Sequence, residues 1–307
     1  MVSDERFCDV GRGITLCYES FGDPSDPPVL LVMGLATQMI AWHEDFCRQL
    51  ADRGFYVVRF DNRDIGRSTH MGVAPPSTRE LVRRRVRPEQ YDLSDMAEDA
   101  RGLLRELDIE PAHVVGASMG GMIGQTLAAD HPEAVRSLTS IMSSTGNRWS
   151  GQPSLSIYKY LLRRPPTDRE GYIERAAEIF GVIGSPGFPR DDAYIRERAA
   201  HSFDRGYDIR GGGRQLGAIV ASGDRTRKLG EITVPTLVIH GTEDKMIRPS
   251  GGKATADAIP GARLLMIEGM GHDLPRGAWP RLIEAIADHA HRADRAQAEA
   301  TAPAART

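Results

Sequence analysis

The sequence predicts an α/β protein in which helices flank a mostly parallel sheet. Short runs rich in Val, Ile and Leu recur along the chain, as expected for strands that are buried on both faces. These runs alternate with segments that carry apolar residues at helical spacing, which indicates βαβ units with right-handed crossovers. The alternation is interrupted at residues 145–225, which contain helical patterns but no strand-like run.

The N-terminal part is predicted to supply a hairpin and two central strands. The runs FCDV and ITLCYESF flank a Gly-Arg-Gly turn, which predicts a hairpin at 7–21. The continuous apolar runs PVLLVMG (28–34) and YVVRFDN (56–62) are typical of buried strands. Residues 37–53 carry apolar residues at helical spacing and are followed by Gly54, which predicts a helix between these two strands.

A second set of alternating elements follows a Pro- and Arg-rich stretch at 69–92 that we expect to be irregular. LSDMAEDARGLLREL (93–107) has the pattern of an amphipathic helix. HVVGAS (113–118) is a predicted strand that leads directly into a predicted helix at 119–130. SLTSIMSS (137–144) is the sixth predicted strand, counting the hairpin as two.

The C-terminal part resumes the alternation, with strands predicted at 234–241 and 262–269 and helices at 249–259 and 277–289. In α/β folds, ligands bind at the carboxyl edge of the sheet, so the inserted helices are placed there as a lid. We therefore expect an α/β core at 1–144 and 226–292, a helical cap at 145–225 inserted after the sixth strand, and a flexible tail at 293–307.

Composition excludes several classes of function. The chain has 307 residues and a formal net charge of −3, which argues against a partner that is a nucleic acid or an anionic membrane. No apolar run reaches the length of a membrane span, and the N-terminus has no signal-like apolar region. Three cysteines without a framework spacing predict reduced thiols, so we expect a cytoplasmic protein. We expect neither a metal nor a cofactor, because no ligand cluster or phosphate-binding glycine pattern occurs.

Ser118 is the strongest candidate for a catalytic residue. It lies in Gly-Ala-Ser-Met-Gly, between a predicted strand and a predicted helix, which is the context of a nucleophile elbow. Such a turn forces a strained serine conformation and requires small residues two positions away, here Gly116 and Gly120. It also leaves the Met119 N–H at a helix N-terminus, where it can stabilise an oxyanion. The five-residue pattern alone is a weak signal, and the flanking elements strengthen it.

A serine nucleophile needs a base, and the base needs a carboxylate that orients it. His272 and Asp244 each follow a predicted C-terminal strand, so both belong to the same edge of the sheet as Ser118. Their order in the chain, Ser then Asp then His, is the order expected on this kind of fold. The neighbouring Glu243 is an alternative acid, whereas Asp273 follows the wrong strand for that role.

A second oxyanion donor is expected from the loop after the strand at 28–34. We assign it to the backbone N–H of Leu35, with Gly34 allowing the chain to pass close to the serine. A substrate pocket suited to a medium-sized hydrophobic ester is predicted around this loop and the cap, although Trp42 could equally be helix packing. The predicted pocket residues are Met33, Gly34, Trp42, Met142, Trp149 and Leu274.

The chain resembles the α/β-hydrolase superfamily from about residue 10 to residue 290. The resemblance is carried by GASMGG (116–121), DNRDIGRS (61–68), PTLVIHGTED (235–244) and GMGHDLP (269–275), and it is strongest to the branch typified by aclacinomycin methylesterase. It implies a Ser118 nucleophile, an Asp244 acid and a His272 base under a helical cap.

Two positions depart from the pattern of many members of the superfamily. Met33-Gly34 stands where they have His-Gly, and a methionine cannot supply the hydrogen bonds of that histidine. Asp64 replaces a glycine in the Asp-x-Arg-Gly motif. Asp61 and Arg63 in the same motif are interpreted as a buried ion pair, or as loop-bracing hydrogen bonds, rather than as catalytic groups.

The sequence thus predicts a serine hydrolase that cleaves a carboxylic ester, with methyl esters among the candidates, through an acyl-enzyme. A lactonase, a C–C hydrolase or a cofactor-free haloperoxidase or perhydrolase would use the same triad, and sequence alone does not separate them. A non-catalytic ligand receptor is a further alternative, disfavoured because all three triad residues are present. The expected partner is a small-molecule ester, and a homodimer remains open.

Overall fold

The computed structural model describes residues 5–161 and 163–301. Within them, a single sheet of eight strands has the order β1-β2-β4-β3-β5-β6-β7-β8. β2 runs antiparallel to both β1 and β4, and all other neighbours are parallel, so the predicted hairpin and mostly parallel sheet are confirmed. The strands are β1 (Arg6–Asp9), β2 (Thr15–Phe21), β3 (Pro28–Val32), β4 (Tyr56–Phe60), β5 (Ala112–Ala117), β6 (Val135–Ile141), β7 (Thr236–Gly241) and β8 (Arg263–Ile267).

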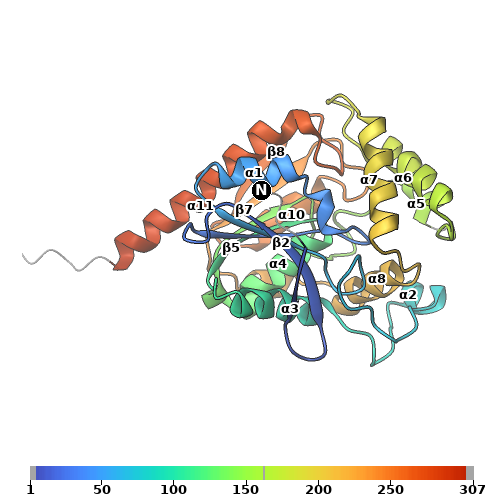
Figure 1. Cartoon of the computed structure of the whole chain (residues 1–307), viewed down its shortest axis with the longest axis horizontal. Helices are drawn as coiled ribbons and strands as arrows, with labels where there is room; N and C mark the ends of the chain where they lie inside the picture. The colour runs from blue at the N-terminus through green and yellow to red at the C-terminus, as the bar shows by residue number, and fades with distance from the viewer. Residues whose placement is uncertain (1–4, 162, 302–307) are drawn as a thin grey trace, which may run out of the picture.

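Helices cover both faces of the sheet (Figure 1). The α1 helix (Glu44–Ala51) and the α11 helix (Trp279–Thr301) pack on one face. On the other face lie α3 (Leu93–Glu106), α4 (Met119–Asp130), and the shorter α9 (Thr226–Leu229) and α10 (Ser250–Ala258). The predicted fold class is therefore confirmed.

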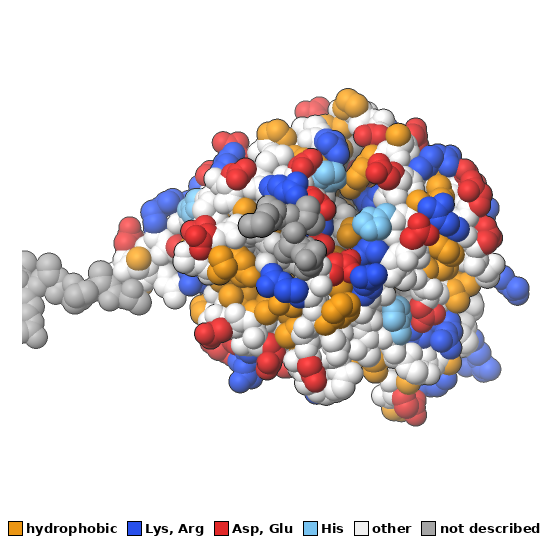
Figure 2. All heavy atoms as spheres, viewed as in Figure 1, with side chains coloured by type: hydrophobic (Ala, Val, Ile, Leu, Met, Phe, Trp, Pro, Cys, Tyr) orange, Lys and Arg blue, Asp and Glu red, His pale blue; other side chains and the backbone are white. Residues whose placement is uncertain are grey.

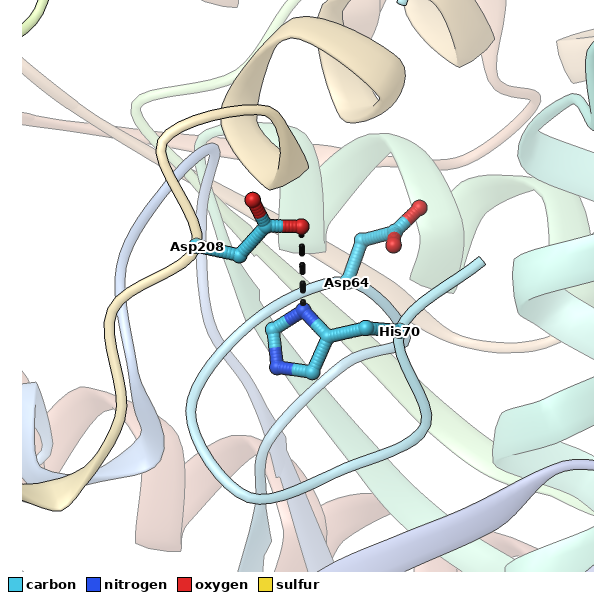
Figure 3. Close-up of side chains that lie close together, drawn as sticks. All are labelled: Asp64, His70 and Asp208. Carbon is cyan, nitrogen blue, oxygen red and sulfur yellow. Dashed lines mark ion pairs between the residues drawn. The ribbon is translucent and has the colours of Figure 1, made fainter. Parts of the chain in front are cut away.

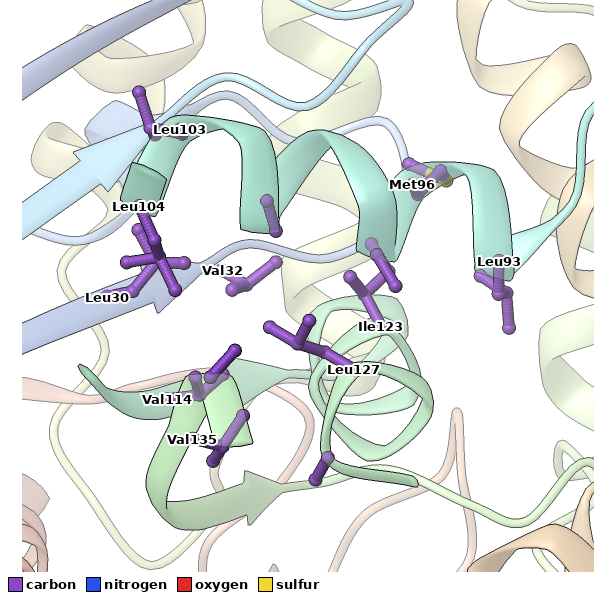
Figure 4. Packing of buried hydrophobic residues seen from close by; sticks show 14 of the residues in the cluster. Leu30, Val32, Leu93, Met96, Leu103, Leu104, Val114, Ile123, Leu127 and Val135 are labelled. Atoms are coloured by element: carbon purple, nitrogen blue, oxygen red, sulfur yellow. The ribbon is translucent and has the colours of Figure 1, made fainter. Parts of the chain in front are cut away.

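The continuous apolar run of β3 follows from its place between these two layers. Leu30 and Val32 point towards α3 and α4, where they meet Leu104 and Ile123 (Figure 4). The alternate residues Val29 and Leu31 belong to the cluster on the opposite face. All four strand side chains are completely buried, and each such burial contributes about 1.5–3 kcal/mol.

In the described part of the chain, five helices lie between β6 and β7, and the four before α9 fall within the stretch predicted as a cap (Figure 1). These four are α5 (Leu155–Leu161), α6 (Arg169–Ile183), α7 (Asp192–Arg205) and α8 (Gly211–Ser222). The glycine triplet at 211–213, which sequence suggests as a hinge or loop, forms the first turn of α8. A Cβ on Gly211 would lie 2.0 Å from the Asp64 carbonyl oxygen, so glycine lets this turn approach the core closely.

Two other elements differ from the sequence expectation. The stretch predicted as irregular contains the short helix α2 (Thr78–Arg83), which begins with a capping box between Ser77 and Glu80. The last helix, α11, was expected to end at 289 but continues to Thr301 and projects beyond the body of the molecule (Figure 1). Residues 293–301 of the predicted flexible tail are therefore helical, and 302–307 lie outside the described residues.

Buried ion pairs connect the cap to the core. The Arg205 Nη2 atom of α7 lies 2.9 Å from Asp61 Oδ2, and Arg214 Nη2 of α8 lies 2.7 Å from Asp64 Oδ1. An ion pair between Asp61 and Arg63 does not form, because Arg63 instead binds Asp99 of α3. The alternative expectation, loop-bracing hydrogen bonds, is confirmed for Asp61, whose carboxylate accepts from the N–H groups of Met39 at 2.7 Å and Arg67 at 3.1 Å. Asp99, which its helical position suggests as a surface charge, is consequently buried.

Asp64, His70 and Asp208 offer ligand atoms that lie within 4.8 Å of one another (Figure 3). Arg214 already pairs with both carboxylates, through its Nη2 atom 2.7 Å from Asp64 and 2.5 Å from Asp208. A guanidinium in this position competes with a cation for the same oxygens. We therefore interpret the cluster as an ion-pair network that holds α8 on the core.

Acidic and basic side chains are interspersed over the face seen in Figure 2, without a large field of one sign. Among the described residues, no helix is both long and apolar enough to cross a membrane. Cys8, Cys17 and Cys47 are all free and buried.

Candidate active site

The turn between β5 and α4 presents Ser118 at the carboxyl edge of the sheet. Its backbone has φ 56° and ψ −120°, a conformation that side-chain-bearing residues rarely adopt. A Cβ on Gly116 would lie 2.1 Å from the Gly120 carbonyl oxygen, and a Cβ on Gly120 would lie 2.1 Å from the Val32 carbonyl oxygen. Both glycines are therefore required by the close approach of strand, turn and helix.

His272 lies between Ser118 and Asp244. Its Nε2 atom is 3.0 Å from Ser118 Oγ, and its Nδ1 atom is 2.7 Å from Asp244 Oδ2. Asp244 is almost completely buried, whereas Ser118 and His272 are partly exposed, so a substrate can reach the hydroxyl while the carboxylate is kept from water. This arrangement can transfer the serine proton to an imidazole whose orientation is fixed by the acid.

Backbone groups determine which acid faces the histidine. The Oδ1 atom of Asp244 accepts hydrogen bonds of 2.8 Å from the N–H groups of Met246 and Ile247, which leaves Oδ2 for His272. Glu243, the alternative acid, is exposed and uses its own N–H to bind the Met270 carbonyl. The geometry thus favours Asp244.

His240 lies beside the acid, with its Nε2 atom 3.5 Å from Asp244 Oδ2. Its Nε2 atom donates to the Ile247 carbonyl at 2.8 Å. Burial is the main cause that lowers the pKa of His240, so the neutral ring is favoured. The structural role that its position at a strand end suggests fits this contact.

The predicted oxyanion donors flank the serine. Met119 is the first residue of α4, where N–H groups lack partners within the helix and the helix dipole is positive. On the other side, a Cβ on Gly34 would lie only 3.0 Å from Ser118 Cβ, which places the loop after β3 against the nucleophile. In the described part of the chain, the Leu35 N–H has no hydrogen-bond partner.

The predicted pocket residues do not all gather at the site. Met33 and Met142 are buried in the cluster on the α1 face, and Leu274 packs against that cluster. Trp42 is completely buried against Phe46 of the same cluster, so it packs a helix instead of lining an open pocket. Trp149 is 81 % exposed and stacks under Arg148, so nothing places it in the pocket.

The cap supplies contacts that sequence inspection missed. The Ile183 carbonyl, at the end of α6, accepts a 2.7 Å hydrogen bond from the His272 N–H. Ser185 accepts a hydrogen bond from the Gly271 N–H and donates one to Asp273. Gln215 of α8 binds the loop after β3. These residues belong to no short motif, and the one available signal is Gln215, a polar residue in the largely apolar helix α8.

Comparison with known proteins identifies the family to which the chain belongs. Residues 27–183 match the family model described as the alpha/beta hydrolase fold. Rhodomycin D methylesterase from Streptomyces sp. strain C5 is 32% identical over 301 residues, with 90% of this chain and 95% of that protein covered. The enzyme of the same name from Streptomyces peucetius is 31% identical over 299 residues, with coverage of 90% and 95%.

A solved structure gives the same architecture. The enol-lactonase from Burkholderia xenovorans LB400 superposes with a TM-score of 0.72 at 23% sequence identity. The match covers 92% of this chain and 99% of that chain. At this level of sequence identity, the structural similarity indicates a shared fold and does not indicate a shared reaction.

Proposed function

The chain belongs to the α/β-hydrolase fold family, and from that premise we propose that it is a carboxylic ester hydrolase with a catalytic triad of Ser118, His272 and Asp244. The single observation that carries the triad is the chain of contacts from Ser118 Oγ through the His272 ring to Asp244, at 3.0 Å and 2.7 Å. A buried acid, an oriented imidazole and a partly exposed hydroxyl together make a serine nucleophilic near neutral pH.

The reaction begins when Ser118 Oγ attacks the ester carbonyl carbon and its proton passes to Nε2 of His272. The carbonyl π electrons move to the oxygen, which accepts hydrogen bonds from the N–H groups of Leu35 and Met119. Collapse of the tetrahedral intermediate breaks the bond to the alkoxy oxygen, and His272 protonates that oxygen as the alcohol leaves. Water, deprotonated by the same imidazole, then attacks the acyl-enzyme and releases the acid.

We propose a methyl ester as the class of substrate. Support comes from two relatives that are named methylesterases and are 31–32% identical to this chain over nine-tenths of its length. The substrate is expected to bind as a small molecule, without a cofactor.

The test compares purified wild-type protein with the Ser118→Ala variant on short aryl esters and methyl esters. We expect hydrolysis by the wild type and a loss of at least about 10⁴-fold in the variant, because the nucleophile is removed. A fluorophosphonate should label the wild type at Ser118 with loss of fluoride, as detected by peptide mass. Equal turnover by the two proteins would overturn the triad. An unreactive Ser118 in the wild type would favour a ligand receptor.

The same preparation separates the related reactions that use this triad. Lactones and peracid formation from acetate and hydrogen peroxide are assayed beside the methyl esters. A kcat/KM for methyl esters above that for lactones and for peracid formation supports the proposed substrate class. A preference for lactones or for peroxide would retain the triad and contradict the methyl ester.

A further inference from the structure

We propose that Gln215, a residue of the cap, is a positioning residue for the oxyanion hole. Its side-chain amide fixes the turn Gly34–Thr37 that carries the Leu35 N–H, so the hole is complete only while α8 is seated on the core. The proposal rests on the proposed function, because it assigns a role to a residue that acts through Leu35. The side chain of Gln215 binds the Ala36 N–H and the Arg63 carbonyl and not a residue of the triad.

The turn after β3 has a conformation that its own sequence does not favour. The Thr37 N–H donates to the Gly34 carbonyl at 3.3 Å, so Leu35 and Ala36 are the two central residues of a β-turn. Ala36 has φ +53°, whereas Leu35 is not among the residues with positive φ. This combination defines a type II turn, which favours glycine at the third position because of the positive φ. With alanine there, hydrogen bonds to the central peptide have to stabilise it. Thr37 Oγ1 donates to the Leu35 carbonyl at 3.0 Å from within the turn, and a second contact comes from outside it.

Gln215 makes that contact. Its Oε1 atom accepts a 2.8 Å hydrogen bond from the Ala36 N–H. The Ala36 N–H belongs to the central peptide of the turn, and the direction of this peptide is what distinguishes a type II turn from a type I turn. A flip of the peptide would break the hydrogen bond and shift Leu35, whose own N–H is the proposed donor to the oxyanion.

The amide of Gln215 is held at its other end as well. Its Nε2 atom donates a 2.8 Å hydrogen bond to the Arg63 carbonyl, and the Arg63 side chain is in turn paired with buried Asp99. The side chain of Gln215 is completely buried. Because only oxygen can face the Ala36 N–H and only nitrogen can face the Arg63 carbonyl, both groups fix the same orientation of the amide.

The fit of α8 explains why the cap can reach the turn. A Cβ on Gly212 would lie 3.0 Å from Ala36 Cβ, so the first turn of the helix rests directly on the oxyanion turn. Met33, which stands where many superfamily members have a histidine, offers no side-chain donor to this loop. Asn62 holds the Met33 carbonyl at 3.0 Å, and Gln215 holds the turn beyond it.

The test uses Gln215→Met, which keeps the length of the side chain and removes both hydrogen bonds. Losing one oxyanion donor costs about 10²–10³-fold in kcat, so a misplaced donor should lower kcat by at least about 10-fold. We expect KM to change by less than about 3-fold, since the ground-state ester does not need the hole. The affinity for a trifluoromethyl ketone, which mimics the tetrahedral intermediate, should fall in parallel with kcat/KM.

Two further variants make the result specific. Gln215→Glu, protonated in this buried site, keeps an oxygen that can accept from the Ala36 N–H and an O–H that can donate to the Arg63 carbonyl, so it should recover most of the lost kcat. Gln90→Met is the matched control, because Gln90 also binds α8, through the Arg214 carbonyl at 3.0 Å, but does not touch the turn. We expect kcat of Gln90→Met within about 2-fold of wild type. An equal loss in Gln90→Met would mean that any loosening of the cap is sufficient, and would overturn the proposal.

A readout that does not depend on activity separates this proposal from the proposed function. Amide hydrogen exchange at Ala36 should be slow in the wild type and in Gln215→Glu, and fast in Gln215→Met. Wild-type protein without esterase activity but with this exchange pattern would refute the function and leave the role of Gln215 in the turn. Slow exchange at Ala36 together with wild-type kcat in Gln215→Met would refute the role of Gln215. If Gln215→Met fails to fold, Gln215→Leu and Gln215→Glu carry the comparison.

Discussion

The Nε2 atom of His272 lies 3.0 Å from the Oγ atom of Ser118, although 154 residues separate them in the chain. Ser118 is held by the elbow between β5 and α4, and His272 by the loop after β8. That loop also rests on the cap, because the His272 N–H binds the Ile183 carbonyl. The geometry of the site therefore depends on the sheet and on the cap together.

Replacing the acid tests the orientation of the imidazole. In Asp244→Asn, the amide can still accept from Met246 and Ile247, but it no longer stabilises the imidazolium or selects the tautomer with a proton on Nδ1. We expect kcat/KM for an aryl ester to fall about 10⁴-fold. The matched control is Glu243→Gln, which should stay within about 2-fold because Glu243 is exposed. A larger loss in Glu243→Gln than in Asp244→Asn would reverse the assignment of the acid.

Two glycines near the nucleophile are expected to respond differently to a methyl group. In Gly116→Ala, the new Cβ would lie 2.1 Å from a backbone oxygen of Gly120, so the elbow has to shift. We expect a loss of about 1–3 kcal/mol in the free energy of unfolding and a marked loss of kcat, measured by urea titration and ester hydrolysis.

Gly124→Ala is the comparison for that change. Its Cβ would meet only the side chains of Leu138 and Val114, at 3.0 Å and 3.1 Å, and alanine favours a helix interior by about 1 kcal/mol. We expect a free energy of unfolding within about 1 kcal/mol of the wild-type value and a nearly unchanged kcat. Identical behaviour of the two variants would contradict the close-packing explanation.

The sequence predicts the parts of this protein that are set by local pattern. The apolar run of β3 and the glycines around Ser118 reflect constraints that act within a few residues, so their elements were assigned correctly. The length of α11 was not, because a polar, Ala-rich continuation gives the same signal whether it is helical or frayed. The capping box of α2 was present at Ser77 and Glu80 but lay in a stretch dominated by Pro and Arg.

The contacts that the sequence does not predict are mainly those between residues that are distant in the chain. Asp61 was expected to form a buried ion pair or loop-bracing hydrogen bonds, and it makes the latter with the N–H groups of Met39 and Arg67. Its ionic partner is Arg205 and that of Arg63 is Asp99, so the two neighbours in sequence do not pair with each other. Only the packing of α7 and α3 on the core decides this. The role of Gln215 cannot be predicted from sequence for the same reason, since a glutamine in an apolar helix does not reveal which backbone group it faces.

The buried pair of Arg205 with Asp61 should be costly to break from one side. Arg205→Met leaves Asp61 and Glu5 without the guanidinium that they share, so we expect a loss of about 3 kcal/mol in the free energy of unfolding. In the background of Asp61→Asn, the same change should cost clearly less, which a double-mutant cycle by urea titration measures. Equal costs in both backgrounds would show that the two residues are not coupled.

His289 should make the folded state sensitive to mild acid. Burial is the largest cause that lowers its pKa to about 4, while its Nε2 atom faces the carbonyls of Leu138 and Pro235 at 3.2 Å. The unfolded chain binds a proton near pH 6.5, so unfolding takes up a proton between about pH 6.5 and pH 4. In that window the free energy of unfolding falls as the pH falls. His289 contributes at most about 1.4 kcal/mol per pH unit to this decrease.

The variant His289→Gln keeps an N–H that can donate to the two carbonyls and removes the titration. At pH 7.5 the variant lacks the contribution that the neutral, buried histidine makes to the free energy of unfolding. The two proteins are therefore compared by the slope of this free energy against pH, and not by its absolute value. Between pH 6.5 and pH 5, we expect wild type to lose up to about 2 kcal/mol more than the variant, measured by urea unfolding at several pH values. Parallel pH profiles would show that His289 is protonated equally in both states. The acid sensitivity of the protein would then have to come from its other buried histidines, His113 and His240, whose pKa values are also lowered chiefly by burial.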